Sequence, residues 1–505
     1  MKRVLIISMS LFFGMVQSLC AGSFKIVGTR PLGMGGAHVA VAEDAIAQYW
    51  NPAGFARQRA IDIQVPLGLG MKTTRGLIKE VDDLAKLVEQ ANKIKANQES
   101  GTYDPKTLKE FMNIVNELED LNQSGLGVII DGHLGAEVRL GNLGVGILNT
   151  TEMAGDPTLH FKFGLGDTAD SAWKQLADSG ALDYNQDGAA GNSTLSAEEQ
   201  QVADYLKGVI DKSGVSLPGG WDSGDIAQEL VTAGVDAGLS LEEIQQAGEI
   251  VSENADTLAA ITDGFSGNQS NVTLTGISLT ELAVTYARPL LKENLYVGAN
   301  AKFMRGDVGF YRQDVFAGEE LQKALYSNFD KNHKASYAIG VDAGVLYDLR
   351  KSWRTKVGMV IRNLNKPTFK QPDAGKAAGL DDISVSPQMR VGVAVYPLNF
   401  ITLAADMDIT KNETVLDGFK SQNLGLGAEL NILNKPSLNL ALRAGVMKNL
   451  AEKDVGSVLT AGVGLNLLHF NVDVGGAIST KTTEVADGKK YPTSAVASAT
   501  LSLNF

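Results

Sequence analysis

The chain has 505 residues, a formal net charge of −13, and 44% hydrophobic and 20% charged residues. This hydrophobic content excludes wholesale disorder and supplies a large apolar surface to bury or to place against lipid. The acidic balance argues against a nucleic-acid binder, whose footprint is a basic patch, so we expect no nucleic-acid partner. The single cysteine, Cys20, excludes a disulfide scaffold and a multi-cysteine metal site.

Residues 1–21 have the organisation of a signal peptide. Lys2 and Arg3 precede an apolar stretch from Val4 to Val16, and small residues follow, so we expect cleavage after Ala21. The mature chain would then hold no cysteine, which suits an oxidising compartment outside the cytoplasm. No run of ~18 apolar residues follows, so no transmembrane helix is predicted.

Residues 22–59 form a segment of small side chains ahead of the first predicted strand. Its glycines do not indicate a phosphate loop, because no Gly-Lys-Ser/Thr follows them and no strand precedes them. The segment has the right size to fold back as a plug, here called the hatch, inside the barrel that the later strands predict. The candidate hatch motif consists of Arg30, Gly33, Gly35, Gly36, Asn51, Pro52, Ala53 and Gly54.

Most of residues 60–505 alternates with a period of two. In 337–349, for example, Tyr337 and Val341 point one way, whereas Asp342 and Gly344 point the other. Such strings suit either a soluble sandwich with its apolar face inward or a membrane barrel with that face outward. The segments last about 10–14 residues, the length of a tilted strand that crosses a bilayer, and short and long connections alternate. These features favour an all-β membrane barrel.

We expect about 14 antiparallel strands, an even number as in single-chain bacterial barrels. An even count also places both ends of the barrel and every short turn on the periplasmic side. The strands are predicted at 60–71, 126–140, 142–164, 272–287, 294–306, 335–349, 353–363, 388–397, 400–410, 421–433, 437–447, 457–468, 469–480 and 493–505.

Two inserts, 74–124 and 167–268, interrupt the barrel. Apolar residues at i, i+3 and i+4 predict helices in both, and their place on the long-loop side predicts an extracellular cap. Residues 167–266 hold 19 Asp and Glu against 3 Lys, a net charge of −16 that leaves +3 for the rest of the chain. The acidity therefore belongs to the cap, either as a solvated surface or as a cation-rich surface that bridges to lipopolysaccharide or another cell.

Residues 183–188 of this cap resemble the opening of an EF-hand calcium loop. Oxygen ligands at alternate positions can converge on one hard cation, and the glycine permits the tight turn. Thr194 stands where the usual bidentate glutamate would be, and a Glu four or five residues later closes the loop instead. The candidate ligands of calcium are Asp183, Asn185, Asp187 and Glu199; the alternative is a polar turn. No other cofactor is expected.

The hatch motif, read as Arg-x-x-Gly-Met-Gly-Gly-Ala followed by Trp-Asn-Pro-Ala-Gly, resembles the N-terminal signature of the FadL-like outer-membrane barrel superfamily. Residues 279–283, 360–367 and 406–412 resemble a closer group, the TraF-like conjugal transfer proteins. The resemblance implies a fourteen-stranded barrel with an N-terminal hatch, in the outer membrane of a Gram-negative bacterium. It also implies that Phe505 ends a terminal strand read by the barrel-assembly machinery.

An enzyme is not expected. The five histidines are scattered, and neither a His-Glu-x-x-His nor a Gly-x-Ser-x-Gly motif occurs. Charged residues of both signs fall on the predicted inward faces, which indicates a neutralised polar lumen rather than acid–base pairs. These residues are Arg139, Lys302, Asp342, Arg390, Asp406, Asp408, Glu429, Arg443 and Asp473.

Three functions remain open. The first is diffusive uptake of hydrophobic small molecules past the hatch, with outer-membrane lipid and a hydrophobic ligand as partners. The alternatives are a non-transporting secretion or conjugation assembly partner and a calcium-stabilised surface protein. An apolar pocket beside Asn51–Gly54, or an opening in the wall, would favour transport, whereas a solidly filled barrel with an apolar patch on the cap would favour docking.

Overall fold

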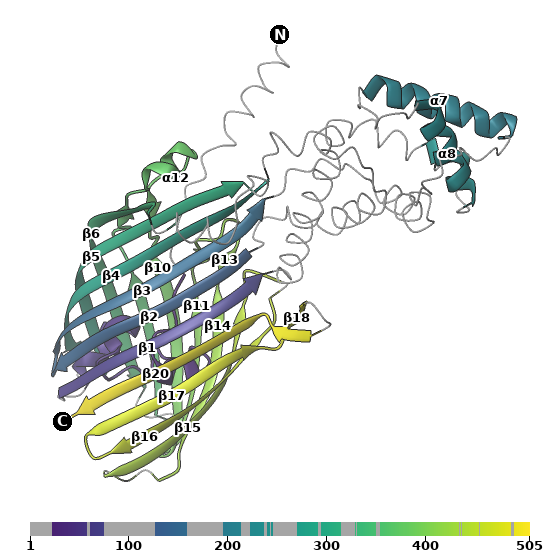
Figure 1. Cartoon of the computed structure of the whole chain (residues 1–505). Helices are drawn as coiled ribbons and strands as arrows, with labels where there is room; N and C mark the ends of the chain where they lie inside the picture. The colour runs from purple at the N-terminus through teal and green to yellow at the C-terminus, as the bar shows by residue number, and fades with distance from the viewer. Residues whose placement is uncertain are drawn as a thin grey trace, which may run out of the picture.

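Fourteen antiparallel strands close into one barrel in the computed structural model of the chain, as the alternating pattern predicts (Figure 1). The structure describes residues 23–57, 61–74, 127–158, 195–213, 223–236, 270–290, 294–314, 331–349 and 354–505, the last range apart from 434, 436, 454 and 486–488, together with 240–242, 244–245 and Phe329.

The barrel strands are β1 (Ile61–Thr74), β2 (Gly127–Leu140), β3 (Leu143–Thr158), β4 (Asn271–Leu290), β5 (Leu295–Asp314), β6 (His333–Leu349), β7 (Thr355–Arg362), β10 (Gln388–Leu398), β11 (Ile401–Asp408), β14 (Asn423–Asn431), β15 (Leu438–Asn449), β16 (Val458–Leu467), β17 (Phe470–Ser479) and β20 (Ser494–Asn504).

The barrel closes where β1 meets β20. β1 pairs with β2 on one side, starting at Ile61 opposite Leu140, and with β20 on the other, where Asp62 lies opposite Asn504. Phe505 and the tight connection Gly141–Asn142 lie at the same end, here called the short-turn end. The opposite end, here called the long-loop end, carries the long connections.

The alternating side chains sort by polarity around the wall. On β6, Tyr337 and Ile339 are 63% and 66% exposed on the outer surface, whereas Asp342 and Leu346 are at most 1% exposed inside. The same outward apolar face continues around the barrel, on Leu69, Val145, Val284 and Leu501 among others. An apolar outer surface and a polar interior exclude the sandwich alternative and confirm the predicted facing of these strands.

β4 and β5 extend furthest beyond their predicted bounds. Each contains 20 residues, and they pair without a break from Leu290 opposite Leu295 to Asn271 opposite Asp314. The prediction ended the second strand at residue 306, eight residues before β5 ends. The strand continues because Val308 and Phe310 are fully buried inside the barrel.

The N-terminal segment runs inside the barrel, coloured purple in Figure 1. It contains two short helices, α2 (Thr29–Gly33) and α3 (Ala47–Trp50), and the 3₁₀ helix η1 (Pro52–Ala56). Most of its side chains are buried, and Phe24, Trp50 and Phe55 pack together with wall residues in one apolar cluster. The hatch therefore fills the lumen with a core of its own, as the sequence predicts.

Two connections at the long-loop end fold over the barrel mouth. One, residues 363–387, contains β8 (Thr368–Phe369), α12 (Asp373–Ala377) and β9 (Ile383–Ser384); the other contains β12 (Asn412–Glu413) and β13 (Lys420–Ser421). Phe369, Leu416 and Phe419 from these connections are at most 2% exposed and pack against wall residues. A third hairpin, β18 (Thr482–Val485) with β19 (Lys489–Pro492), continues from β17.

The second insert contains two described helices, α7 (Ala197–Ser213) and α8 (Ser223–Asp236). Their apolar faces meet in a small core that includes Leu206 and Val231, and Figure 1 shows the two helices side by side. The first insert, 74–124, and the signal peptide, 1–21, lie outside the described residues, so both stay predictions. Among the described helices, none has the length and hydropathy to cross a membrane.

Candidate functional site

Helix α2 is held to the wall by a buried network of charges. Arg30 donates from Nε and Nη2 to the two carboxylate oxygens of Glu429, both at 2.8 Å. Glu429 also accepts from Arg443 Nε at 2.7 Å, and Arg443 in turn pairs with Asp473. In this set of four residues, here called the Arg30 network, the predicted inward charges Glu429, Arg443 and Asp473 neutralise one another together with Arg30 from the hatch.

The middle of the hatch binds a second pair of wall charges. The backbone amides of His38 and Val39 donate to Asp406 Oδ2 at 2.7 and 2.8 Å. Arg390 pairs with Asp408 at 2.9 Å and donates to the Gly36 carbonyl at 2.9 Å. The sequence places these carboxylates inside the barrel, but it does not show that they bind hatch backbone.

The glycines of the motif bring backbone against backbone. Gly35 and Gly36 have φ of +64° and +76°, which side chains rarely adopt. A Cβ at Gly35 would stand 2.7 Å from the Val446 carbonyl oxygen and closer still to that of Leu426. Thr460 Oγ1 bridges this turn, because it accepts from the Gly35 amide at 3.0 Å and donates to the Gly33 carbonyl at 3.1 Å.

The Asn51–Gly54 turn is the other fixed point of the hatch. Asn51 Nδ2 donates to the carbonyls of Val39 and Val345, both at 3.0 Å, and its Oδ1 accepts from the Ala53 amide at 3.2 Å. Pro52 begins η1 and packs on Gly344, where a Cβ would stand 2.8 Å from Pro52 Cδ. Ala53 and Gly54 are buried. This turn therefore joins the two halves of the hatch to β6.

His38 is fully buried beside Trp50, with ring centroids 5.5 Å apart. Among the described residues, neither ring nitrogen has a hydrogen-bond partner. Burial, together with the Arg30 charge, holds the pKa of His38 well below its usual range, so the ring is neutral at pH 7.

Acid should therefore weaken the hatch through His38. The unfolded chain binds a proton at this ring below about pH 6.5 and the folded chain does not, so stability falls as the pH drops through that value. At pH 5.5 the loss attributable to His38 is about 1.4 kcal/mol. Unfolding midpoints measured at pH 7.5 and 5.5 should differ less in His38→Phe than in the wild type; equal acid sensitivity would contradict this assignment.

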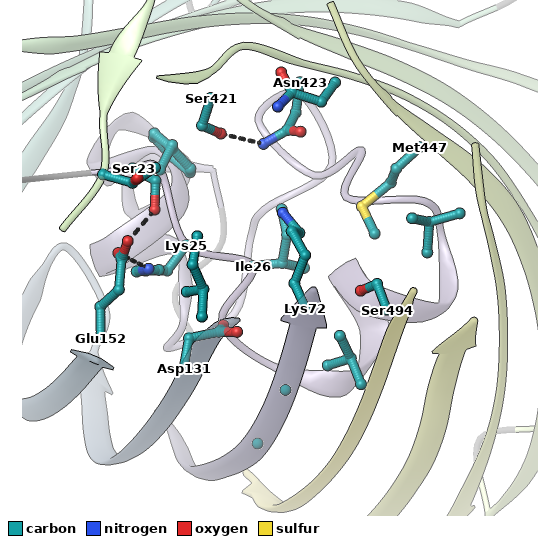
Figure 2. A pocket seen from close by; sticks show the side chains of 18 of the residues that line it. Ser23, Lys25, Ile26, Lys72, Asp131, Glu152, Ser421, Asn423, Met447 and Ser494 are labelled. Carbon is teal, nitrogen blue, oxygen red and sulfur yellow. Dashed lines mark hydrogen bonds and ion pairs between the residues drawn. The ribbon is translucent and has the colours of Figure 1, made fainter. Parts of the chain in front are cut away.

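Two cavities flank α2. The outer cavity, on the long-loop side, measures about 120 Å³ and is lined by hatch residues Phe24 and Ile26 together with wall residues including Lys72, Met447 and Val496 (Figure 2). The inner cavity measures about 400 Å³ and is lined by Arg30, Asn439, Asn471 and other polar residues of the short-turn end. Leu32 faces the first cavity and Arg30 the second, so α2 is the partition between them.

These cavities do not lie where the hypothesis of transport placed a pocket. Within the described chain, both large cavities run along residues 23–33, while Asn51–Gly54 packs tightly on β5 and β6. The Asn51 turn leaves no space because Pro52 and Ala53 lie directly against Gly298 and Gly344 of the wall.

The pairing of β1 with β2 is interrupted between Gln64, which lines the inner cavity, and Gly68, which lines the outer cavity. The pairing of β1 with β2 runs from Gln64 opposite Glu137 to Leu67 opposite Leu134, and the two positions between them, Val65 and Pro66, make no ladder contact. Pro66 lacks the amide proton that the ladder needs. The seam between β1 and β2 is therefore weaker here than in the neighbouring pairs.

The other predicted site residues are Phe505 and the candidate calcium ligands. Phe505 is 64% exposed at the short-turn end, exchanges backbone hydrogen bonds with Ile61 and stacks on His469 with centroids 5.1 Å apart. Asp183, Asn185 and Asp187 lie outside the described residues. Glu199 forms a capping box at the start of α7, because its carboxylate accepts from the Ser196 amide at 2.6 Å. The calcium site stays a prediction.

The sequence does not identify two charged residues of the outer cavity, Lys72 and Asp131. Lys72 follows the predicted end of its strand at residue 71, and Asp131 sits among glycines that carry little facing information. A one-residue extension of the alternation would have placed Lys72 on the inner face, in line with Gln64 and Gly70.

Fold and lumen together define a plugged β-barrel, with fourteen strands around a folded-back N-terminal hatch. The sequence model of the family described as "F plasmid transfer operon, TraF, protein" matches residues 48–408, more than half of the chain, and the chain belongs to this family. This confirms the resemblance to TraF-like proteins.

Several solved structures are similar over nearly their whole length. The toluene transporter TbuX of Ralstonia pickettii shares 12% identity, with 95% of this chain and 98% of that chain covered and a TM-score of 0.42. The Pseudomonas putida toluene transporter TodX shares 10% sequence identity, with 95% of this chain and 98% of that chain covered and a TM-score of 0.42. A Pseudomonas aeruginosa FadL homologue shares 9% sequence identity, with 97% of this chain and 99% of that chain covered and a TM-score of 0.39. No curated protein matches the chain.

Proposed function

We propose that the protein is an outer-membrane barrel of a Gram-negative bacterium through which small hydrophobic molecules diffuse past the hatch. The outer apolar surface faces lipid, the short-turn end faces the periplasm, and the long-loop end faces the medium. The observation that carries the proposal is the outer cavity, a space of about 120 Å³ between the hatch and the wall whose lining combines apolar side chains such as Phe24, Ile26 and Met447 with polar ones. An engineered cavity of about 150 Å³ binds benzene, so this space suits a molecule of that size.

The inner cavity completes a route. A molecule in the outer cavity is separated from the 400 Å³ inner cavity by α2 alone, and α2 is held by side chains rather than by strand pairing. Displacement of this one helix would join the two spaces. The proposed activity is not enzymatic, because it needs binding and passage only.

Filling the outer cavity should stop uptake. Val496 lines the cavity on β20, and the next residue, Ala497, is exposed on the outer surface. In a Gram-negative host without general porins, the wild type should raise the initial uptake of labelled toluene, 3-methylbutan-1-ol or 4-methylpentanoate several-fold. Val496→Trp should abolish the increase, and Ala497→Trp should retain it. The proposal fails if none of these probes enters faster in cells with the wild-type protein.

The other expectations keep their own tests. Deleting Phe505 should lower the yield of folded barrel if the assembly machinery reads this residue. Calcium bound through Asp183, Asn185, Asp187 and Glu199 should raise the melting temperature of the cap, and Asp183→Asn should remove the shift. The family's name refers to a plasmid transfer operon; a role as a secretion or conjugation partner would gain support if uptake fails while the cap still binds another envelope protein.

A further inference from the structure

The outer cavity carries two opposite charges without partners. Lys72 on β1 and Asp131 on β2 both line it, and within the described chain neither side chain has a hydrogen-bond or ion-pair partner. Lys72 has one contact of its charged group, Nζ lying 5.5 Å from the centroid of the Phe419 ring. Figure 2 shows the Lys72 side chain extending from its strand into the cavity, with Asp131 on the adjacent strand.

Strand pairing places the two charges on one face. Gly70 lies opposite Asp131 and Lys72 opposite Ile129, so Lys72 and Asp131 are diagonal neighbours that both point inward. Such diagonal positions are ~7–8 Å apart, a separation that a lysine side chain can span. Among the described residues Lys72 instead directs Nζ toward the Phe419 ring and forms no ion pair with Asp131, so one small ligand can reach both charges. Gly70 keeps the space between them open, because a Cβ there would stand 2.7 Å from Asp131 Oδ1.

The other charged groups facing the cavity are already satisfied. Lys25 pairs with Glu152, which also accepts from Ser23 at 3.2 Å. His133 accepts from the Gly28 amide at 3.2 Å. The remaining lining is apolar or neutral, and includes Phe24, Ile26, Met447 and Val496. One positive and one negative group are thus left to a ligand, in a surrounding of apolar and neutral polar side chains.

We infer that the outer cavity binds a small hydrophobic zwitterion, a molecule with an ammonium and a carboxylate on adjacent carbons and an aliphatic or aromatic side chain. The carboxylate accepts from Lys72, the ammonium donates to Asp131, and the side chain packs among Phe24, Ile26 and Met447. This inference rests on the proposed function and names the substrate class of its site.

Charge complementarity favours a zwitterion over the simpler ligands. A plain carboxylate would meet Lys72 but would bring its charge beside Asp131, and a plain amine would have the reverse problem with Lys72. A neutral hydrocarbon would contact the apolar part of the lining but leave both charges without a partner, so it should bind more weakly than a zwitterion of the same size. A volume of about 120 Å³ limits the side chain to about the size of a leucine or a benzene ring.

Four matched probes test the inference on the full-length protein in lipid nanodiscs by calorimetric titration. Leucine carries both charges, 4-methylpentanoate the carboxylate alone, 3-methylbutylamine the ammonium alone, and 3-methylbutan-1-ol neither. Leucine should bind at least about tenfold more tightly than each of the other three, because each charge-assisted contact contributes about that factor. Val496→Trp should abolish binding of all four.

The variants assign each charge to its residue. Lys72→Met should reduce the affinity for leucine to that for 3-methylbutylamine. Asp131→Asn should reduce the affinity for leucine to that for 4-methylpentanoate. The exchange Lys72→Asp with Asp131→Lys should restore part of the preference for leucine. Protection of Lys25 from trypsin reports whether each variant keeps a seated hatch.

The relative affinities of the four probes separate the inference from the proposed function. Tighter binding of 4-methylpentanoate or 3-methylbutylamine than of leucine would overturn the inference in favour of a singly charged ligand, and equal binding of all four probes would show that the two charges are not used. In both cases the proposed uptake survives. Absence of binding and of uptake for every probe, by contrast, would remove the proposed function as well.

Discussion

Replacing Gly35 by alanine is expected to destabilise the protein by about 2–5 kcal/mol. The backbone at Gly35 has φ of +64°, which costs a residue with a Cβ ~1–2 kcal/mol. The new methyl group would also overlap the carbonyl oxygens of Leu426 and Val446, and overpacking of this kind adds ~1–3 kcal/mol. The hatch should leave its seat first, so trypsin should cut at Lys25 in the variant and not in the wild type.

Gly141 provides a matched control for this substitution. It has φ of +65°, almost the same as Gly35, but nothing lies within 4 Å of the position that its Cβ would take. Gly141→Ala should therefore show the backbone effect alone, ~1–2 kcal/mol, with full protection of Lys25. If both variants lost the same stability, contact between hatch and wall at Gly35 would not be what holds the segment.

Glu429→Ala should release α2 and open the lumen. Its carboxylate accepts from both Arg30 and Arg443, so its removal leaves Arg30 without an acceptor and Arg443 with Asp473 alone. Removing one partner of a buried ion pair costs about 3–5 kcal/mol. Because α2 separates the outer and inner cavities, we expect a measurable ionic current through the variant in a planar bilayer and almost none through the wild type.

An exposed ion pair is the control for Glu429. Lys420 and Glu413 lie 2.8 Å apart with side chains that are 46% and 38% exposed. Such pairs contribute ~0–1 kcal/mol, so Glu413→Ala should leave both the melting temperature and the bilayer current unchanged. If Glu429→Ala changed neither quantity, α2 would be held instead by Thr460, which donates to the Gly33 carbonyl, and by Thr500, whose Oγ1 accepts from the Thr29 amide at 3.1 Å.

The wall of the barrel could be predicted from the sequence because its signal repeats. Each strand alternates between lipid-facing and lumen-facing side chains, so one pattern, seen fourteen times, gave the strands, their faces and the inward charges. The ends were less accurate where local chemistry changes. The prediction missed the last eight residues of β5, and Lys72 lies one residue beyond the predicted end of β1.

The lumen could be predicted only in outline. The small residues of 22–59 indicate close packing, but a sequence does not say which backbone amide meets which carboxylate. The pairs of Arg30 with Glu429 and of His38 with Asp406 join positions separated by 399 and 368 residues. Such contacts depend on the register of many strands, and a local pattern carries no information about them.

The closure of β1 on β20 has a consequence for the order of assembly. The hatch leads directly into β1, the first strand of the seam, while its partners Asp406, Glu429 and Thr460 belong to strands synthesised far later. A segment with its own apolar cluster and wall contacts along the lumen would otherwise have to enter a closed barrel whose long-loop end is covered by connections, so we expect it to be in place before closure. We therefore expect the sheet to form around the hatch and the pairing of β1 with β20 to form last. A folding intermediate should then be an open sheet that already holds the hatch.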